Sequence, residues 1–189
     1  MIVLAIDTAG VDCSAAVYDS DKDAVLGQAT ETIGRGHAEK LMEKIDAALA
    51  EAGLSLEAVE RIAVTVGPGS FTGIRVGVAA ARGLALALGI PAVGVSTLAV
   101  LASAETASAP VVAVIDAKRD EIYIQAFDQA RAIDQAIVGS AEDARDLVER
   151  LGARVTGSAA PLLDGNPVET QPDHFQIAIV ARLGAAGDP

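Results

Sequence analysis

The sequence is poor in the residues that disulfide frameworks and metal sites require. Its 189 residues include one cysteine, two histidines, no tryptophan and only 3% aromatic residues. A single cysteine excludes an intrachain disulfide and favours a reducing compartment, so we expect a cytoplasmic location. HExxH and CxxC motifs are absent, so we predict no metal site of the chain's own. Cys13 falls in an apolar strand pattern, and we expect a buried, inert thiol; the alternative is a catalytic pair with a histidine.

Basic residues are scarce as well. The chain has 14 Lys and Arg against 26 Asp and Glu, a formal net charge of −12. Direct binding of nucleic acid is not expected, because phosphate neutralisation requires clustered basic residues. The first residues lack the basic and long apolar regions of a signal peptide. Arg75 and Arg82 interrupt the most apolar segment, so we expect no membrane span.

What the chain does contain is an alternation of strand and helix patterns. Hydrophobic residues make up 51% of it, mostly Ala, Val, Leu and Ile. Period-2 and short apolar runs predict strands, and i, i+3, i+4 spacings predict helices. We expect strands at 2–6, 13–18, 24–32, 62–66, 92–95, 112–127 (a second meander) and 154–158. We expect helices at 37–52, 70–88, 96–104, 140–151 and 176–183. The pattern predicts an α/β fold.

The opening of the chain recurs in its second half. Val3–Asp19 (VLAIDTAGVDCSAAVYD) aligns with Val112–Asp128 (VAVIDAKRDEIYIQAFD) at a constant offset, and Asp7 falls on Asp116. The shared order of apolar strand, acid, polar turn, apolar strand and acid suggests two copies of one β-β-β-α unit. We therefore predict two domains, residues 1–106 and a smaller one at 107–189.

The most informative stretch is residues 64–89, VTVGPGSFTGIRVGVAAARGLALALG. After the strand, Gly67-Pro68-Gly69 predicts a sharp turn, and Ser70 or Thr72 can cap the following helix. Small residues recur at every fourth position of that helix: Gly73, Gly77, Ala81, Ala85 and Gly89. The helix is apolar nearly all round, so it must be covered on more than one side, by its own sheet and by a second domain or another polypeptide.

We predict that two helices form the surface that a partner covers. The predicted interface residues are Leu41, Met42, Ile45, Leu49, Gly73, Gly77 and Ala81. An exposed apolar surface of this kind also predicts self-association as a homodimer when the chain is alone.

Two further groups of residues suggest ligand contacts. Asp7 and Asp116 end equivalent strands, where carboxylates can hold the Mg²⁺ of a nucleotide between two lobes; alternatively each caps its own turn. In GPGSFTG, Ser70 and Thr72 at the helix start, with Arg75 in the first turn, can cradle a phosphate; alternatively the segment is only a turn.

These segments resemble the bacterial TsaB (YeaZ) family. The resemblance rests on LAIDTAG, GRGHAEKLMEKI, VTVGPGSFTGIRVGVAAARGLALALGIPAVGVSTL and VIDAKRDEIY, and covers residues 1 to about 127. It implies the duplicated RNase H-like fold of actin, Hsp70 and sugar kinases. It also implies a non-catalytic subunit that pairs with the paralogous transferase TsaD and with the ATPase TsaE. That complex adds threonylcarbamoyl to N6 of adenosine 37 in tRNAs that read ANN codons.

The resemblance assigns most chemistry to the partners. It implies that the chain contacts tRNA only through the complex. It also implies that the chain has no cofactor of its own, and that any ATP or ADP with Mg²⁺ binds at a subunit interface. His37 is expected to cap a helix or lie at an interface rather than bind metal. Two alternatives remain: a free-standing small-molecule kinase of the same superfamily, suggested by Asp7, Asp116 and GPGSFTG, and a peptidase, for which no zinc set or nucleophile–histidine pair is found.

Overall fold

The computed structural model describes residues 1–105, 109–164 and 172–188 as two compact units. The first unit comprises Met1–Thr97 and His174–Pro189, and the second Leu98–Asp173. The units divide between Thr97 and Leu98 rather than between residues 106 and 107 as predicted, so residues 98–105 belong to the second unit. The structure also differs from the prediction at the end of the chain, because the last segment belongs to the first unit rather than the second.

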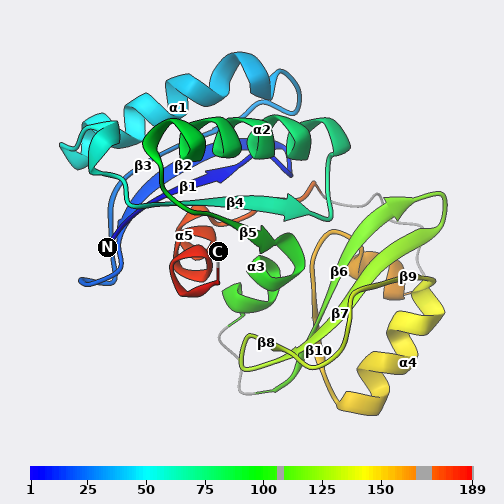
Figure 1. Cartoon of the computed structure of the whole chain (residues 1–189). Helices are drawn as coiled ribbons and strands as arrows, with labels where there is room; N and C mark the ends of the chain where they lie inside the picture. Colours follow the sequence, from blue (N-terminus) through cyan, green and yellow to red (C-terminus); the bar gives the residue numbers. More distant parts are fainter. Residues whose placement is uncertain (106–108, 165–171, 189) are drawn as a thin grey trace. The chain divides into compact units, whose positions relative to one another are not determined.

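The first unit is built on a five-stranded sheet with the order β3-β2-β1-β4-β5 (Figure 1). Its strands are β1 (Ile2–Asp7), β2 (Asp12–Asp19), β3 (Ala24–Thr32), β4 (Arg61–Gly67) and β5 (Ala92–Ser96). Its helices are α1 (His37–Ala52), η1 (Leu56–Ala58), α2 (Phe71–Leu88) and α5 (Ile177–Ala186), and α3 (Thr97–Ala104) leads into the second unit. The first three strands form the predicted antiparallel meander, and β4 and β5 add in parallel.

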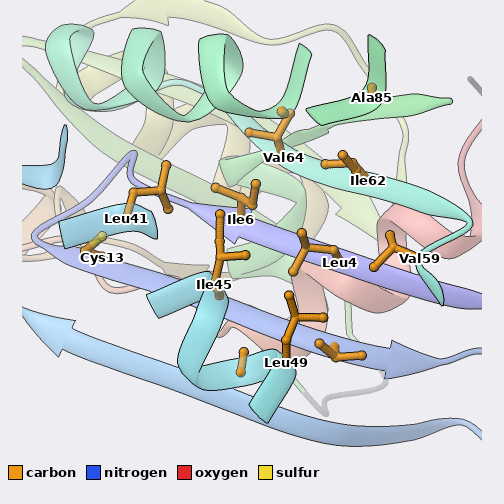
Figure 2. Packing of buried hydrophobic residues seen from close by; sticks show 14 residues of the cluster. Leu4, Ile6, Cys13, Leu41, Ile45, Leu49, Val59, Ile62, Val64 and Ala85 are labelled. Carbon is orange, nitrogen blue, oxygen red and sulfur yellow. The ribbon is translucent and has the colours of Figure 1, made fainter. Parts of the chain in front are cut away.

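Helices α1 and α2 lie side by side on one face of this sheet and α5 covers the other (Figure 1). Figure 2 shows how Leu4 and Ile6 of β1 point toward Leu41 and Ile45 of α1. Because side chains alternate along a strand, Val3, Ala5 and Asp7 face α5 instead. Both faces of β1 are therefore buried, which explains why its sequence is a continuous apolar run.

Helix α5 is tied to the sheet at its C-terminal end. Gly184 lies so close to Ala63 that a side chain at this glycine would overlap it. Nη1 of Arg61 donates hydrogen bonds to three backbone carbonyls, those of Gly184 (3.2 Å), Ala185 (2.9 Å) and Gly187 (2.8 Å). A cation at the C-terminal end of a helix satisfies its free carbonyls and interacts favourably with the helix dipole.

The second unit carries a smaller sheet with the order β10-β6-β7-β8, and β9 also pairs with β7. Its strands are β6 (Val111–Lys118), β7 (Glu121–Asp128), β8 (Arg131–Ala132), β9 (Ile137–Gly139) and β10 (Arg154–Thr156). Besides nearly all of α3, the helices are α4 (Ala141–Leu151) and η2 (Ala160–Asp164), the last in a stretch where no helix was predicted. Ser140 and Asp143 form a reciprocal capping box at the start of α4.

The two units repeat one topology, as predicted. In each, a first strand pairs antiparallel with the next, a third strand adds outside the second, a helix follows, and a fourth strand returns parallel to the first. The series β1-β2-β3-α1-β4 thus corresponds to β6-β7-β9-α4-β10. This arrangement is the duplicated RNase H-like fold, with a reduced second copy.

Candidate functional site

The turn before α2 fixes where that helix begins. Gly67 has a φ of 98°, the bond to Pro68 is cis, and the Ser70 N–H donates to the carbonyl of Ala9 (2.7 Å). The Ser70 hydroxyl accepts the N–H of Gly73 (3.2 Å), so Ser70 rather than Thr72 is the helix cap. The predicted turn and cap are confirmed.

The row of small residues on α2 faces inward. Gly73, Gly77, Ala81 and Ala85 are buried on the sheet. A Cβ at Gly73 would overlap the carbonyl oxygen of Thr8, and one at Gly77 would lie 2.5 Å from the Thr8 hydroxyl. The prediction that Gly73, Gly77 and Ala81 face a partner is wrong in this structure, because all three are buried within their own unit. The two glycines lie against Thr8 in the β1–β2 turn.

The apolar stripe of α1 is corrected in the same way. Leu41, Ile45 and Leu49 are buried in the core between α1 and the sheet (Figure 2). Their i, i+4, i+8 spacing is that of the core-facing side of an amphipathic helix. Met42 alone of the four predicted α1 interface residues is exposed, at 48%.

The outer face of α2 carries the large exposed apolar groups. Phe71 is 74% exposed and Leu86 is 85% exposed. The Arg75 guanidinium lies 5.0 Å from the centroid of the Phe71 ring, a cation–π distance. Among the described residues α2 is also the one helix that is long and apolar enough to span a membrane by length and composition. Its inner row, however, packs on the sheet, so its outer row is what a partner can reach.

A hollow of about 440 Å³ lies where α1 and α2 begin. It is lined by Gly34, Arg35, Gly36, His37, Ala38, Glu39, Ser70, Thr72, Gly73 and Val76. Ser70 and Thr72, two of the predicted phosphate contacts, therefore share one cavity with the start of α1. The third, Arg75, is not part of the lining and stacks on Phe71 instead. Phosphate binding here stays a prediction.

Asp7 is fully buried at the end of β1. Its Oδ1 accepts the Ala9 N–H (3.0 Å) and the Thr65 hydroxyl (2.6 Å), whereas Oδ2 has no hydrogen-bond partner among the described residues. Burial raises the pKa of this carboxyl from 3.8 to about 6, against the opposing effect of the Thr65 hydrogen bond. The bond to Ala9 is the turn-capping arrangement that was predicted as the alternative to a metal contact.

Asp116 repeats this arrangement in the second unit. Its Oδ1 accepts the Lys118 N–H (2.7 Å), and its Oδ2 pairs with the Lys118 ammonium (2.6 Å). The aspartates belong to different units, and joint Mg²⁺ binding stays a prediction. In residues 1–105, 109–164 and 172–188, no three His, Cys, Asp or Glu side chains gather closely enough to hold a metal ion.

Both histidines contact Asp12, which was not predicted from the sequence. His37 Nε2 lies 3.1 Å from the Asp12 carbonyl, which only accepts, so this nitrogen carries the proton. His174 Nδ1 lies 2.7 Å from the Asp12 carboxylate. His37 does not cap α1, since Gly36 occupies that position, but joins α1 to β2. Cys13 is fully buried as predicted, and burial raises the pKa of its thiol to about 11.

The sequence interpretation also missed the exposed residues of α2. Phe71 is the first residue of the helix and stands beside the capping serine, and Leu86 lies near its end. An aromatic side chain directly after a turn in a chain with only 3% aromatic residues was an available signal. The predicted interface was instead based on the small residues of α2, because they recur at every fourth position.

Known proteins resemble this chain in sequence and in structure. Residues 20–164 match the family described as "TsaD: tRNA N6-adenosine threonylcarbamoyltransferase". The tRNA threonylcarbamoyladenosine biosynthesis protein TsaB of Escherichia coli (strain K12) is 37% identical over 126 residues, which are 65% of this chain and 53% of that protein. The chain therefore matches about half the length of this curated relative.

Two solved structures from Pseudomonas aeruginosa cover 98% of this chain and 91% of their own. One is YeaZ, with a TM-score of 0.78 and 29% identity. The other, described as an uncharacterized protein with similarity to peptidase YEAZ, has a TM-score of 0.75 and 30% identity.

Proposed function

This chain belongs to the TsaB (YeaZ) family, and from that premise we propose that it is a non-catalytic subunit of the complex that adds threonylcarbamoyl to N6 of adenosine 37 in tRNAs reading ANN codons. The observation that carries the proposal is the outer face of α2, where Phe71 and Leu86 are exposed to solvent. Large apolar groups on one accessible helix face favour a docking surface over an isolated monomer.

The partner we propose is the paralogous transferase TsaD, joined by the ATPase TsaE. The match of residues 20–164 to the TsaD family supports a common ancestry of the two proteins. Related chains that share α1 and α2 can pack these helices together, so the outer face of α2 would meet the corresponding helices of TsaD. In the absence of TsaD, the same face would bury a second copy of this chain.

The turn-capping contacts of the two aspartates favour a structural role for them over a catalytic one. Oδ1 of Asp7 is engaged by Ala9 and Thr65, while its Oδ2 is unpaired among the described residues, and Lys118 engages both carboxylate oxygens of Asp116. Any ATP or ADP with Mg²⁺ would then lie at the subunit interface, where the hollow at the start of α1 and α2 could contribute Ser70 and Thr72. tRNA would be reached only through the complex, consistent with the net charge of −12.

The proposal is tested by affinity purification of the tagged chain from its native cell. We expect TsaD and TsaE to co-purify, and depletion of the chain to lower threonylcarbamoyladenosine in total tRNA. Phe71→Glu should lose TsaD but keep the thermal unfolding transition of the isolated chain, because Phe71 is 74% exposed. Glu142→Lys, an exposed change on α4, is the control.

Two results would contradict the proposal. One is a purified chain that brings down neither TsaD nor TsaE and whose loss leaves the tRNA modification unchanged. The other is phosphoryl transfer from Mg-ATP by the isolated chain, which would indicate a free-standing kinase. Calorimetry of the isolated chain with Mg-ATP, followed by product analysis, separates these outcomes.

A further inference from the structure

Among the residues that the structure describes, no close packing contact explains why one position of α2, residue 83, is a glycine. Gly83 lies in the second half of the helix and is exposed, and a Cβ built on it would meet no atom within 4 Å. Gly73 and Gly77 differ, since each is required by its approach to Thr8. After proline, glycine is the least favourable residue in a helix interior, so Gly83 weakens α2 without compensation in the isolated chain.

The surface beside Gly83 is hollowed and apolar. A depression of about 390 Å³ is lined by Arg82, Gly83, Ala85, Leu86 and Ala92, all from α2 and the start of β5. Leu86 at its rim is 85% exposed. A depression of this size accepts a bulky apolar side chain, and the missing Cβ of Gly83 lets the backbone that carries such a side chain come close.

The charged residues on the outer face of α2 indicate which kind of partner helix can dock there. The two charged residues of α2, Arg75 and Arg82, are both basic and both exposed. They are seven residues apart, a rise of about 10 Å along the helix. A carboxylate-bearing helix complements them, whereas a second copy docked symmetrically at Gly83 would bring Arg82 toward its own counterpart.

We infer that Gly83 is the point at which an apolar helix of a partner protein crosses α2 at close backbone distance, with a bulky side chain in the depression and a carboxylate paired with Arg82. The inference rests on the proposed function, because the partner is the TsaD-type paralogue. It adds the crossing point and the charge of the partner's helix.

The experiment measures two quantities on each variant: the melting temperature of the isolated chain, and its affinity for purified TsaD of the same organism. Gly83→Ala should raise the melting temperature by about 2–4 °C, because alanine is the better helix former. The same change should weaken TsaD binding about tenfold, and Gly83→Leu about a hundredfold, because the added side chains hold the helices apart. Arg82→Glu should also weaken binding at least tenfold, whereas Arg82→Lys keeps most of it. Arg145→Leu on α4 places the same leucine side chain on an exposed helix position elsewhere and should change neither quantity.

The outcomes are distinguishable. Gain in melting temperature with loss of affinity supports the inference, since a folding defect would lower both. If the wild-type chain does not bind TsaD, the proposed function itself fails. If the wild-type chain binds and Gly83→Leu binds within twofold, the crossing point is wrong while the function stands. If Gly83→Leu abolishes self-association but leaves TsaD binding intact, the occupant is a second copy, and the inference is overturned.

Discussion

The hydroxyl of Thr65 donates a 2.6 Å hydrogen bond to Oδ1 of Asp7, and both residues are fully buried. The second carboxylate oxygen, Oδ2, has no partner among the described residues, and burial raises the pKa to about 6. Asp7 is thus held by its turn and by β4, but its charge is poorly compensated. A buried carboxyl of this kind makes the stability of the first unit depend on pH.

Stability should fall as the pH rises through the pKa of Asp7. The native pKa of about 6 exceeds the ordinary value of 3.8, so the folded state binds the proton more tightly than the unfolded state. The contribution is fully present below about pH 4 and is lost between pH 4 and pH 6. The loss is at most about 3 kcal/mol at neutral pH. Asp7→Asn should remove this slope, as measured by urea unfolding between pH 4 and pH 8.

The control for this measurement is Asp46→Asn, which changes an exposed carboxyl on α1. Its pH dependence should match that of the wild type. An Asp7→Asn variant that keeps the wild-type dependence of stability on pH between pH 4 and pH 6 would show that Asp7 does not carry the effect.

The glycines of α2 should respond to alanine in opposite directions. At Gly73 the new Cβ would overlap the carbonyl oxygen of Thr8, whose hydroxyl also donates to the Gly73 carbonyl (2.7 Å). Gly73→Ala should therefore destabilise the chain by about 2–4 kcal/mol, as overpacking does in a rigid core. Gly83→Ala is the matched control and should stabilise it by about 1 kcal/mol. Denaturant unfolding of the two variants measures both, and equal effects would contradict the packing described for Gly73.

The glycines of α2 also show which features of the structure can be predicted from the sequence and which cannot. The fold class, the repeat of Asp7 at Asp116 and most strand and helix bounds followed from apolar periodicity and turn residues, which are local signals. The direction in which the Gly73 row faces did not follow, because a helix that is apolar nearly all round has no polar side to orient it. Its orientation depends on the β1–β2 turn, which is distant in sequence.

The same limit explains two other errors. The spacing of Leu41, Ile45 and Leu49 marks the buried side of a helix, but it does not say whether the covering surface is the chain's own sheet or another protein. The unit to which α5 belongs could not be predicted either, because its contacts with Ala63 and Arg61 join residues more than a hundred positions apart.

Cys13 should be unreactive in the native chain. The thiol is fully buried, it donates a long hydrogen bond to the His37 carbonyl (3.9 Å), and burial raises its pKa to about 11. Thiolate is the reactive form, so almost none is present at pH 8. Labelling with a thiol reagent at pH 8 should be slow in buffer and fast in denaturant. Rapid labelling of the native chain would show that the site is accessible and would revive a catalytic interpretation of Cys13.

Arg61 should anchor α5, because its Nη1 donates hydrogen bonds to the carbonyls of Gly184, Ala185 and Gly187. Arg61→Met keeps the aliphatic stem of the side chain but removes the guanidinium, and should destabilise the chain by about 2–3 kcal/mol, because the hydrogen bonds of a charged donor are lost and partly buried carbonyls are left unpaired. Backbone amides in α5 should lose protection in hydrogen exchange before those of β1. Arg182→Met, on the same helix, is the control: its ion pair with Asp23 is exposed on both sides, so its loss should cost less than about 1 kcal/mol. If the two variants unfold at the same denaturant concentration, the three carbonyl contacts do not anchor α5, and the packing of Gly184 on Ala63 must hold it alone.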